Sequence, residues 1–303
     1  MPKSLLCAFS SLLIFCSIGY AEDSQGPGGY VEESQEPEEH AEASQEPEQP
    51  KYTGRNPRPF RVALRHIEGK GIGYPCGYTS LDLAMSPYTD DFKLLPVMDV
   101  RTHLFDDGKF AFNAGVTGRY HRNCTVYGMN VYYDYRNARH ARYNQVGGGI
   151  EALGEHWDFR MNGYLPFGIK HSPFYAIKLE GLTLVGREEL ALKGLDFEVG
   201  VHTKCRDPWG FYSGVIPYCY GAKGMNAWGG KLRLLVQWKD YITLEVDGSY
   251  DSLFHGIIQG QISFNIPFGT KKLTVHPADW KPRMVEPVLR SEIIATRHRH
   301  AKV

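Results

Sequence analysis

The chain has 303 residues with 34 basic and 34 acidic side chains, so its formal net charge at pH 7 is zero. A balanced charge gives no bulk attraction to nucleic acid, and we expect no nucleic-acid partner. After residue 21 no window reaches the 18 consecutive apolar residues that indicate a transmembrane helix. The 19 tyrosines and 33 glycines are high for this length and suit a β-rich wall with interfacial aromatic side chains.

Residues 1–21 have the layout of a cleavable signal peptide. Lys3 supplies a short positive start, Leu5 to Ile18 is an apolar stretch, and Gly19-Tyr20-Ala21 ends in a small residue. The apolar stretch is too short for a comfortable membrane span. We therefore predict export across the inner membrane of a Gram-negative cell, with removal of this leader.

Residues 22–58 are acidic and rich in Pro, Glu, Ser and Gln. A ten-residue unit occurs three times from Ala21 to Pro50 (AEDSQGPGGY, VEESQEPEEH, AEASQEPEQP), with ten acidic residues and no Lys or Arg. Such a segment buries too little apolar surface to offset the entropy of ordering it. We predict a disordered, solvated linker; a spacer that contacts a basic partner is the alternative.

Between residues 59 and 275 the sequence alternates with a period of two. The odd positions from 127 to 135 are apolar or aromatic, and most positions between them are Gly or polar. Similar runs recur up to Ile266, and turn residues such as Asp106-Asp107-Gly108, Lys239-Asp240 and Gly154 separate them. Long alternating runs are typical of strands, and we count about twelve of them.

The polar face of these strands is densely ionic, with both signs of charge in neighbouring strands. Alternation suits a secreted soluble sandwich as well as a barrel. Aromatic residues cluster near strand ends, where bilayer interfaces would fall, among them Tyr132, Tyr133, Trp157 and Tyr164. The leader, the strand length and these aromatic residues favour an antiparallel, all-β transmembrane barrel, in which the apolar face meets lipid and the ionic face lines a polar lumen. We predict that twelve side chains face the lumen: Asp99, Arg101, Arg119, Asp134, Arg136, Asp158, Arg160, Asp196, Glu198, Arg233, Glu245 and Asp247.

Four cysteines remain once the leader is removed. Cys76, Cys124, Cys205 and Cys219 would then occupy an oxidising compartment, where disulfides persist. Four cysteines allow three pairings. Cys205 and Cys219 lie in consecutive predicted segments and form our candidate disulfide, whereas a zinc site lacks the Cys-x-x-Cys spacing it would need.

The middle of the chain carries motifs that are more specific than alternation. Tyr127 to Tyr143 reads YGMNVYYDYRNARHARY, Gly147 to Glu151 reads GGGIE, and His156 to Gly168 reads HWDFRMNGYLPFG. This series closely resembles the β-domain of inverse autotransporters, the intimin and invasin family. Weaker likenesses at Ala191–Asp196 and Val285–Arg290 extend the resemblance to the region from Gly71 to Ile294.

The resemblance implies a twelve-stranded barrel whose following linker runs back through the pore and helps to export a C-terminal passenger. It also implies a periplasmic N-terminus. The sequence ends at Val303, so we expect the translocator module with its tail rather than a passenger domain. The implied partners are outer-membrane lipid, the barrel-assembly machinery, periplasmic chaperones and a surface ligand bound through the loops. The alternative function is a porin-like diffusion channel.

The tail, residues 276–303, has a basic balance and three prolines. Prolines 277, 282 and 287 make a long helix before Val288 unfavourable. We expect an extended segment that pairs with lumenal Glu245, Asp247, Asp196 or Glu198 and plugs the pore. Arg297-His298-Arg299-His300 is interpreted as a solvated end rather than a metal site.

Catalytic and cofactor interpretations find little support. The sequence has no Gly-x-Ser-x-Gly, His-Glu-x-x-His or phosphate-loop motif. The glycine run at Gly69, Gly71 and Gly73 is expected to be a closely packed barrel strand. His156 or His202 could partner a serine, but a lumenal histidine paired with a carboxylate is the more common arrangement. We predict no enzyme activity, no cofactor and no metal.

Overall fold

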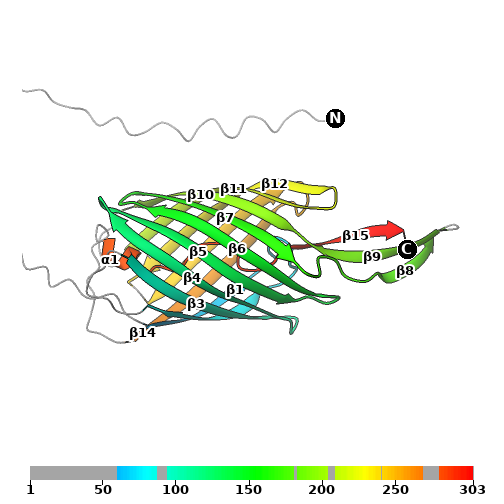
Figure 1. Cartoon of the computed structure of the whole chain (residues 1–303), viewed down its shortest axis with the longest axis horizontal. Coiled ribbons are helices and arrows are strands. Elements are labelled where there is room, and N and C mark those ends of the chain that lie inside the picture. Colours follow the sequence, from blue (N-terminus) through cyan, green and yellow to red (C-terminus); the bar gives the residue numbers. More distant parts are fainter. Residues whose placement is uncertain are drawn as a thin grey trace, which may run out of the picture. The chain divides into compact units, whose positions relative to one another are not determined.

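The computed structural model describes residues 60–86, 94–180, 183–203, 209–239, 241–268 and 280–302. The predicted leader and acidic linker, residues 1–21 and 22–58, lie outside these ranges. Twelve strands form one closed antiparallel barrel (Figure 1). Around the ring their order is β1-β14-β13-β12-β11-β10-β7-β6-β5-β4-β3-β2. The barrel expected from the sequence is confirmed.

The barrel strands are mostly nine to fourteen residues long, the length needed to cross a bilayer when tilted. They are β1 (Phe60–Glu68), β2 (Tyr78–Met85), β3 (Leu94–Phe105), β4 (Phe110–Arg122), β5 (Thr125–Asn137), β6 (Arg142–Leu153), β7 (Trp157–Phe167), β10 (Lys193–Thr203), β11 (Trp209–Ala222), β12 (Met225–Trp238), β13 (Ile242–Asp251) and β14 (Ile257–Phe268). The seam between β1 and β14 is fully paired, from Phe60 opposite Phe268 to Glu68 opposite Gly260. No open edge remains in the ring, as a bilayer requires.

The two faces of each strand differ sharply in exposure. Along β5 the outward side chains run from Tyr127 through Met129 and Val131 to Tyr133, and all four are exposed. Alternate side chains point into the barrel and are buried, including Asp134. The same inversion recurs around the ring, so an apolar belt covers the outside while charges fill the inside.

Two aromatic side chains lie on the opposite face from the one that an interfacial girdle needs. Tyr132 and Tyr164 were grouped with neighbouring aromatics near the bilayer interfaces, but both are buried in the lumen. Their hydroxyls donate to lumenal carboxylates, Tyr132 to Asp99 at 2.9 Å and Tyr164 to Asp196 at 2.7 Å. An aromatic side chain with a polar end is well suited to such a site.

The turn predicted at Asp106-Asp107-Gly108 is confirmed between β3 and β4. Gly108 has a φ of 77°, a value that favours glycine, and its amide donates to the carbonyl of Phe105 at 2.9 Å. The segment at Gly69, Gly71 and Gly73 is not the strand that we expected. It is a loop closed by a bridge between Gly71 and Tyr74, and Gly73 adopts a φ of 81°.

A separate three-stranded sheet extends beyond one end of the barrel strands (Figure 1). It contains β8 (Tyr175–Glu180), β9 (Thr183–Ala191) and the C-terminal β15 (Thr296–Lys302), in the order β15-β9-β8. We call this end of the barrel the exit mouth. The opposite end, where β1 begins, is the entry mouth, and the short helix α1 (Trp280–Arg283) lies there.

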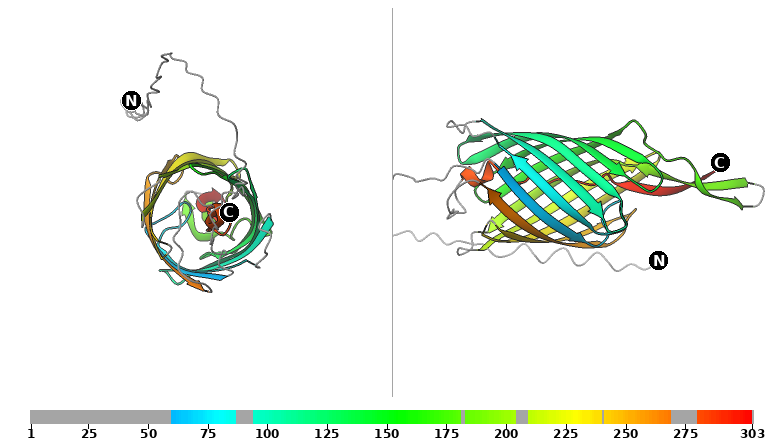
Figure 2. Two further views of the ribbon diagram at one scale, coloured as in Figure 1. Left: turned by 90° about the vertical axis from the view of Figure 1, so that its left-hand side faces the viewer. Right: turned by 90° about the horizontal axis from the view of Figure 1, so that it is seen from below.

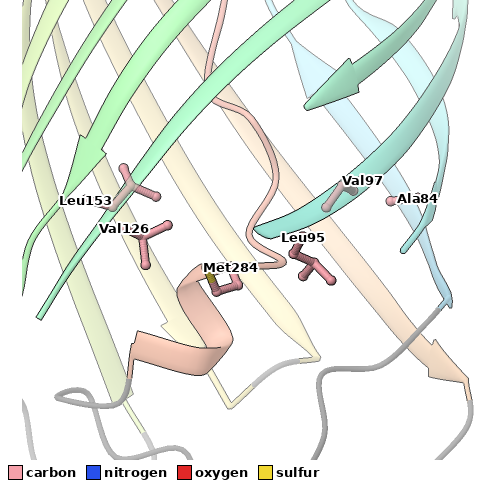
Figure 3. Packing of buried hydrophobic residues seen from close by; sticks show 6 residues of the cluster. All are labelled: Ala84, Leu95, Val97, Val126, Leu153 and Met284. Atoms are coloured by element: carbon pink, nitrogen blue, oxygen red, sulfur yellow. The ribbon is translucent and has the colours of Figure 1, made fainter. Parts of the chain in front are cut away.

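Small apolar clusters close both mouths around the C-terminal segment. At the entry mouth Met284, which follows α1, packs against wall side chains that are shown in Figure 3: Ala84, Leu95, Val97, Val126 and Leu153. At the exit mouth Ile293 packs against Ile67, Tyr78, Phe105 and Ala111. Both ends of the inserted segment are therefore held by apolar contacts. Within the described ranges, no helix is long and apolar enough to cross a membrane.

The lipid-facing belt gives a first prediction. Val215 is exposed near the middle of β11, and Phe211 is exposed nearer the strand end at the entry mouth. We expect Val215→Arg to destabilise the folded barrel in lipid vesicles by about 2–4 kcal/mol and Phe211→Arg by about 1 kcal/mol or less, because an arginine near the interface reaches water. Reversible guanidinium unfolding in vesicles measures both. Equal effects at the two positions would contradict a membrane belt.

Candidate functional site

The candidate site is the passage of the C-terminal segment through the barrel. After α1 at the entry mouth, residues 284–295 run along the lumen to the exit mouth, where β15 begins. Figure 2 looks along the barrel and shows this red segment inside the ring of strands. We call residues 284–295 the strap. It forms no helix or strand of its own, so its polar groups are bonded mainly by the wall.

The strap is clamped at Arg290, whose guanidinium forms a bidentate pair with Asp134 of β5. Nη1 and Nη2 donate to the two carboxylate oxygens at 2.7 and 2.6 Å. The Asp134 side chain is fully buried, and its other partners are the neutral amides of Asn113 and Gln145. The Arg290 guanidinium also lies 4.4 Å from the ring centroid of Tyr132, within cation–π range. The strap thus supplies the cation that this buried carboxylate requires.

A glycine on β6 makes room for the clamp. A Cβ atom on Gly147 would lie 2.2 Å from Nη2 of Arg290, a distance that no side chain could tolerate without displacing the guanidinium. Gly147 is the first glycine of the GGGIE motif in the sequence. At this position the motif therefore has a glycine because the Arg290 side chain of the strap lies against the backbone.

Glu292 makes the reverse pairing, in which the strap provides the anion. Its carboxylate bonds Nη2 of Arg65 at 2.7 Å and also pairs with Arg101. Both arginines are held on the wall as well, Arg65 by Asp82 and Arg101 by Asp99. The backbone carbonyl of Glu292 accepts a bond from Asn113 Nδ2 at 2.8 Å. Two residues apart on the strap, Arg290 and Glu292 thus complete opposite halves of one network.

Arginines near the two mouths complete the binding of the segment. At the entry mouth Arg283 of α1 donates to both carboxylate oxygens of Asp158 at 2.6 and 2.7 Å. Arg119 donates to the carbonyl of Glu286 at 2.6 Å, and at the exit mouth Arg136 donates to the carbonyl of Ile294 at 2.5 Å. Carbonyl groups of the strap that have no hydrogen bond to a neighbouring strand therefore accept hydrogen bonds from buried guanidinium groups.

The carboxylates that we expected to hold the tail have other partners. Glu198 and Glu245 both pair with Arg233, at 2.8 Å each, and Asp247 pairs with Lys231 at 3.0 Å. Asp196 accepts bonds from Asn162 and Tyr164. The expected pairing was wrong because these carboxylates already have hydrogen-bond or ion-pair partners on the barrel wall. The strap instead pairs with side chains of β1, β3, β5 and β7.

All twelve side chains proposed for the lumen lie on barrel strands with their polar groups inside. Ten are buried, and Glu245 and Asp247 are half-buried: the buried ones are Asp99, Arg101, Arg119, Asp134, Arg136, Asp158, Arg160, Asp196, Glu198 and Arg233. Sequence reasoning missed Arg65, Asp82, Asn113 and Glu151 as members of the same network. Each of these residues alternates with outward-facing apolar residues, and this pattern could have assigned them to the lumen.

The remaining candidates are placed as follows. Cys205 lies outside the described residues, and so does its predicted pairing; Cys219 has a free thiol on β11. His156 is exposed, whereas His202 contacts Asp158 at 2.6 Å, a histidine–carboxylate pair in the lumen. In the part of the chain that the structure describes, no three His, Cys, Asp or Glu residues are grouped to hold a metal ion.

Arg297 to His300 form part of β15, where His298 and His300 are exposed, so the end that we expected to be solvated is also a strand. Thr296 to Lys302 pair with Ala191 to Val185 of β9. At the start of β15 the Thr296 hydroxyl donates to Glu189 at 2.7 Å, and further along Arg299 pairs with Glu188. The register also depends on Gly73, where a Cβ atom would lie 2.5 Å from the Thr296 nitrogen. The chain leaving the pore is thus fixed by a sheet.

A histidine in this sheet, His298, has a clearly perturbed pKa. Nδ1 of His298 lies 2.6 Å from the Tyr175 hydroxyl, and the ring of His140 stacks on Tyr175 at 3.6 Å. Desolvation lowers the pKa of His298; Glu189 opposes this effect, and His140, Arg297 and Arg136 reinforce it. The neutral form of His298 is therefore favoured where β15 leaves the barrel.

Comparison with known proteins adds to this geometry. Residues 81–201, from β2 into β10, match the family described as the inverse autotransporter beta-domain. This part of the chain is therefore similar to an inverse autotransporter β-domain. The family resemblance drawn from the central motifs is confirmed, and the protein is an outer-membrane β-barrel. A search of curated proteins gave no match.

Solved structures are also similar to this chain, one of them over most of the barrel. A chain from a study of the in-meso crystallization of membrane proteins is 16% identical, with a TM-score of 0.60 over 79% of this chain and 100% of that chain. Looser similarity links the β-domain to the KdgM porin, at 8% identity and a TM-score of 0.42 over 69% of this chain and 99% of that chain. Similarity to the translocator domain of the autotransporter NalP from Neisseria meningitidis has 10% identity and a TM-score of 0.30, over 71% and 90% of the two chains.

The clamp generates a second prediction. Arg290→Gln and Asp134→Asn should each lower the free energy of unfolding by about 3–5 kcal/mol, because each leaves a buried charge without its partner. The double variant should be at least about 1.5 kcal/mol more stable than the sum of the two single losses predicts. Guanidinium unfolding in detergent measures the free energies of this double-mutant cycle.

Lys109→Gln is the matched control for this cycle. Lys109 also pairs with a carboxylate, that of Asp107, but the two side chains are 25 and 35% exposed in the turn between β3 and β4. We expect a cost of about 1 kcal/mol or less. Strict additivity of the two clamp variants would show that Arg290 and Asp134 do not depend on each other.

Proposed function

We propose that this barrel anchors its own C-terminal segment across the outer membrane and serves as the conduit through which that segment is exported. The observation that carries the proposal is the Arg290–Asp134 pair, both of whose side chains are almost completely buried. The wall gives this carboxylate only neutral amide partners, and its cationic partner comes from the strap. The carboxylate is therefore neutralised only when the strap occupies the lumen. A freely open channel would have no need of that pairing.

The apolar contacts at the mouths support the same function. Met284 fits a cluster at the entry mouth, and Ile293 and Ile294 fit clusters at the exit mouth. β15 then pairs with β9 outside the barrel strands, which holds the segment after it has left the pore. Held at both ends and in the middle, the strap keeps the pore closed. This disfavours the porin-like alternative, in which small solutes would diffuse through the lumen.

We further propose that residues 1–21 direct export and are removed. Periplasmic chaperones and the barrel-assembly machinery would then deliver the chain to outer-membrane lipid, and the loops at the exit mouth would be available to a surface ligand. The apolar belt and the lack of enzyme motifs support a structural or interaction role at the cell surface rather than catalysis.

Intact mass of the protein extracted from outer membranes tests removal of the leader. We expect the mature chain to begin at Glu22, because cleavage follows a small residue such as Ala21. A mass that retains residues 1–21 would contradict the proposal. The fraction recovered in outer membranes, relative to that in inner membranes and periplasm, provides the accompanying measurement of location.

Removal of residues 277–303 tests the strap. We expect the truncated barrel to conduct ions in planar bilayers at least about tenfold better than the full chain, since a twelve-stranded barrel without its occupant encloses an aqueous lumen. The matched control removes only residues 296–303, so β15 is lost and the strap remains. Its conductance should stay close to that of the full chain.

Both truncated proteins must show the heat-modifiable migration of a folded barrel before the comparison is made. Equal conductance of the full chain and the chain lacking residues 277–303 would refute closure by the strap. High conductance of the full chain itself would favour the diffusion-channel alternative.

A further inference from the structure

The hairpin of β8 and β9 carries an apolar patch that the lipid belt does not explain. Ile177, Leu179 and Leu184 are 52, 70 and 48% exposed. Figure 1 shows β8 and β9 extending past the ends of the barrel strands at the exit mouth, with these strands directed away from the belt. Large aliphatic side chains grouped on such a projection mark an interaction site more often than chance exposure.

The register places two of the three side chains on one face of the hairpin. Leu179 is directly opposite Leu184 in the β8–β9 ladder. Ile177 lies beside them, in the irregular stretch of β8 between Tyr175 and Lys178. The patch therefore forms a continuous apolar surface across both strands. We call it the tip patch.

The exposed charges beside the tip patch are basic. Lys178 and Arg187 are both exposed, and both lie on the other face of the hairpin, opposite Val185 and Tyr175 respectively. The acidic residues Glu188 and Glu189 are each only 3% exposed and are occupied by Arg299 and Thr296. Among the described side chains of this sheet, the exposed charges on the face opposite the tip patch are therefore cationic.

We propose that the tip patch inserts into an anionic lipid surface apposed to the exit mouth. Aliphatic side chains flanked by lysine and arginine are the composition of segments that dip into a bilayer interface, where the apolar groups enter the acyl region and the cations meet lipid phosphates. The hairpin projects away from the membrane that holds the barrel, so this surface belongs to a second membrane.

The size of the patch favours a lipid surface over a protein. A stable protein–protein interface buries about 800 Å² on each partner, contributed by about 20–30 residues. The tip patch has three large side chains on a two-stranded projection, which is too small for a self-associating face of that kind. Insertion of a few aliphatic groups into an interface is sufficient for membrane attachment when electrostatic attraction assists it.

The experiment uses the full chain in nanodiscs and measures co-flotation with added vesicles. We expect binding to vesicles of phosphatidylcholine with phosphatidylglycerol and at least about tenfold weaker binding to pure phosphatidylcholine. Leu179→Gln with Leu184→Gln should reduce binding to the anionic vesicles by about tenfold or more, because two aliphatic side chains that would be buried in the vesicle membrane are lost. Lys178→Gln with Arg187→Gln should remove the preference for anionic lipid.

Thr183→Gln is the matched control, because Thr183 lies on the same hairpin but on the face opposite the tip patch. Its binding should equal that of the unchanged chain. Insertion is read independently from Leu179→Trp, whose fluorescence should be quenched by brominated lipid present only in the added vesicles.

Three outcomes would overturn the proposal. These are equal binding of the leucine double variant and the unchanged chain, absence of quenching, or association of the nanodiscs with one another when no vesicles are present. The last outcome would assign the tip patch to a second copy of this chain. All variants alter positions outside the barrel, and heat-modifiable migration checks that each barrel is folded.

Discussion

The structure depends on one electrostatic constraint, which is that charges enclosed by a lipid-embedded barrel must be neutralised inside it. An isolated charge in a medium of low polarity costs far more than a domain can offset. Asp134 shows the constraint most directly, because its amide partners come from the wall and its cation comes from the strap. The wall and the strap therefore form one charge network, and neither is complete in this geometry without the other.

The strap is bound asymmetrically. Its charged groups pair with one side of the ring, through Arg65, Arg101 and Asp134. Arg283 of the preceding α1 pairs with Asp158 on the same side. On the opposite side the carboxylates are bonded by groups of the wall itself, among them Arg233. Carboxylates that are already bonded hold a passing segment weakly, whereas the other side holds it in a single register. Position along the pore is thus determined by charge, and the apolar clusters close the two ends.

Sequence reasoning recovered the barrel because a strand's period of two records which face meets lipid. The runs at 127–135 and 157–165 gave correct faces, and the Asp-Asp-Gly turn gave a correct hairpin. The partners of the strap could not be recovered, because alternation says that Asp134 faces inward but not which residue of a distant segment lies opposite it. Tyr132 and Tyr164 were misplaced for a related reason: tyrosine suits both a membrane interface and a hydrogen-bonded lumen.

β15 was missed because its sequence, TRHRHAK, has little apolar alternation. Its strand conformation comes from the partner, since β9 offers an edge and Glu188 and Glu189 receive Arg299 and Thr296. A strand that forms because a partner edge is available need not show the alternation of apolar and polar residues that predicts a strand. The tight contact at Gly73 is likewise visible only once the loop and the departing chain are seen together.

Thiol accessibility in the middle of the strap tests the central claim most directly. Val288 is 4% exposed, midway between the two mouths. A Val288→Cys chain in which Cys76, Cys124, Cys205 and Cys219 are replaced by serine should react with a soluble maleimide only after denaturation. Rapid labelling of the folded protein in vesicles would show that residues 284–295 do not occupy the lumen, and the account of a charge-matched, closed pore would be wrong.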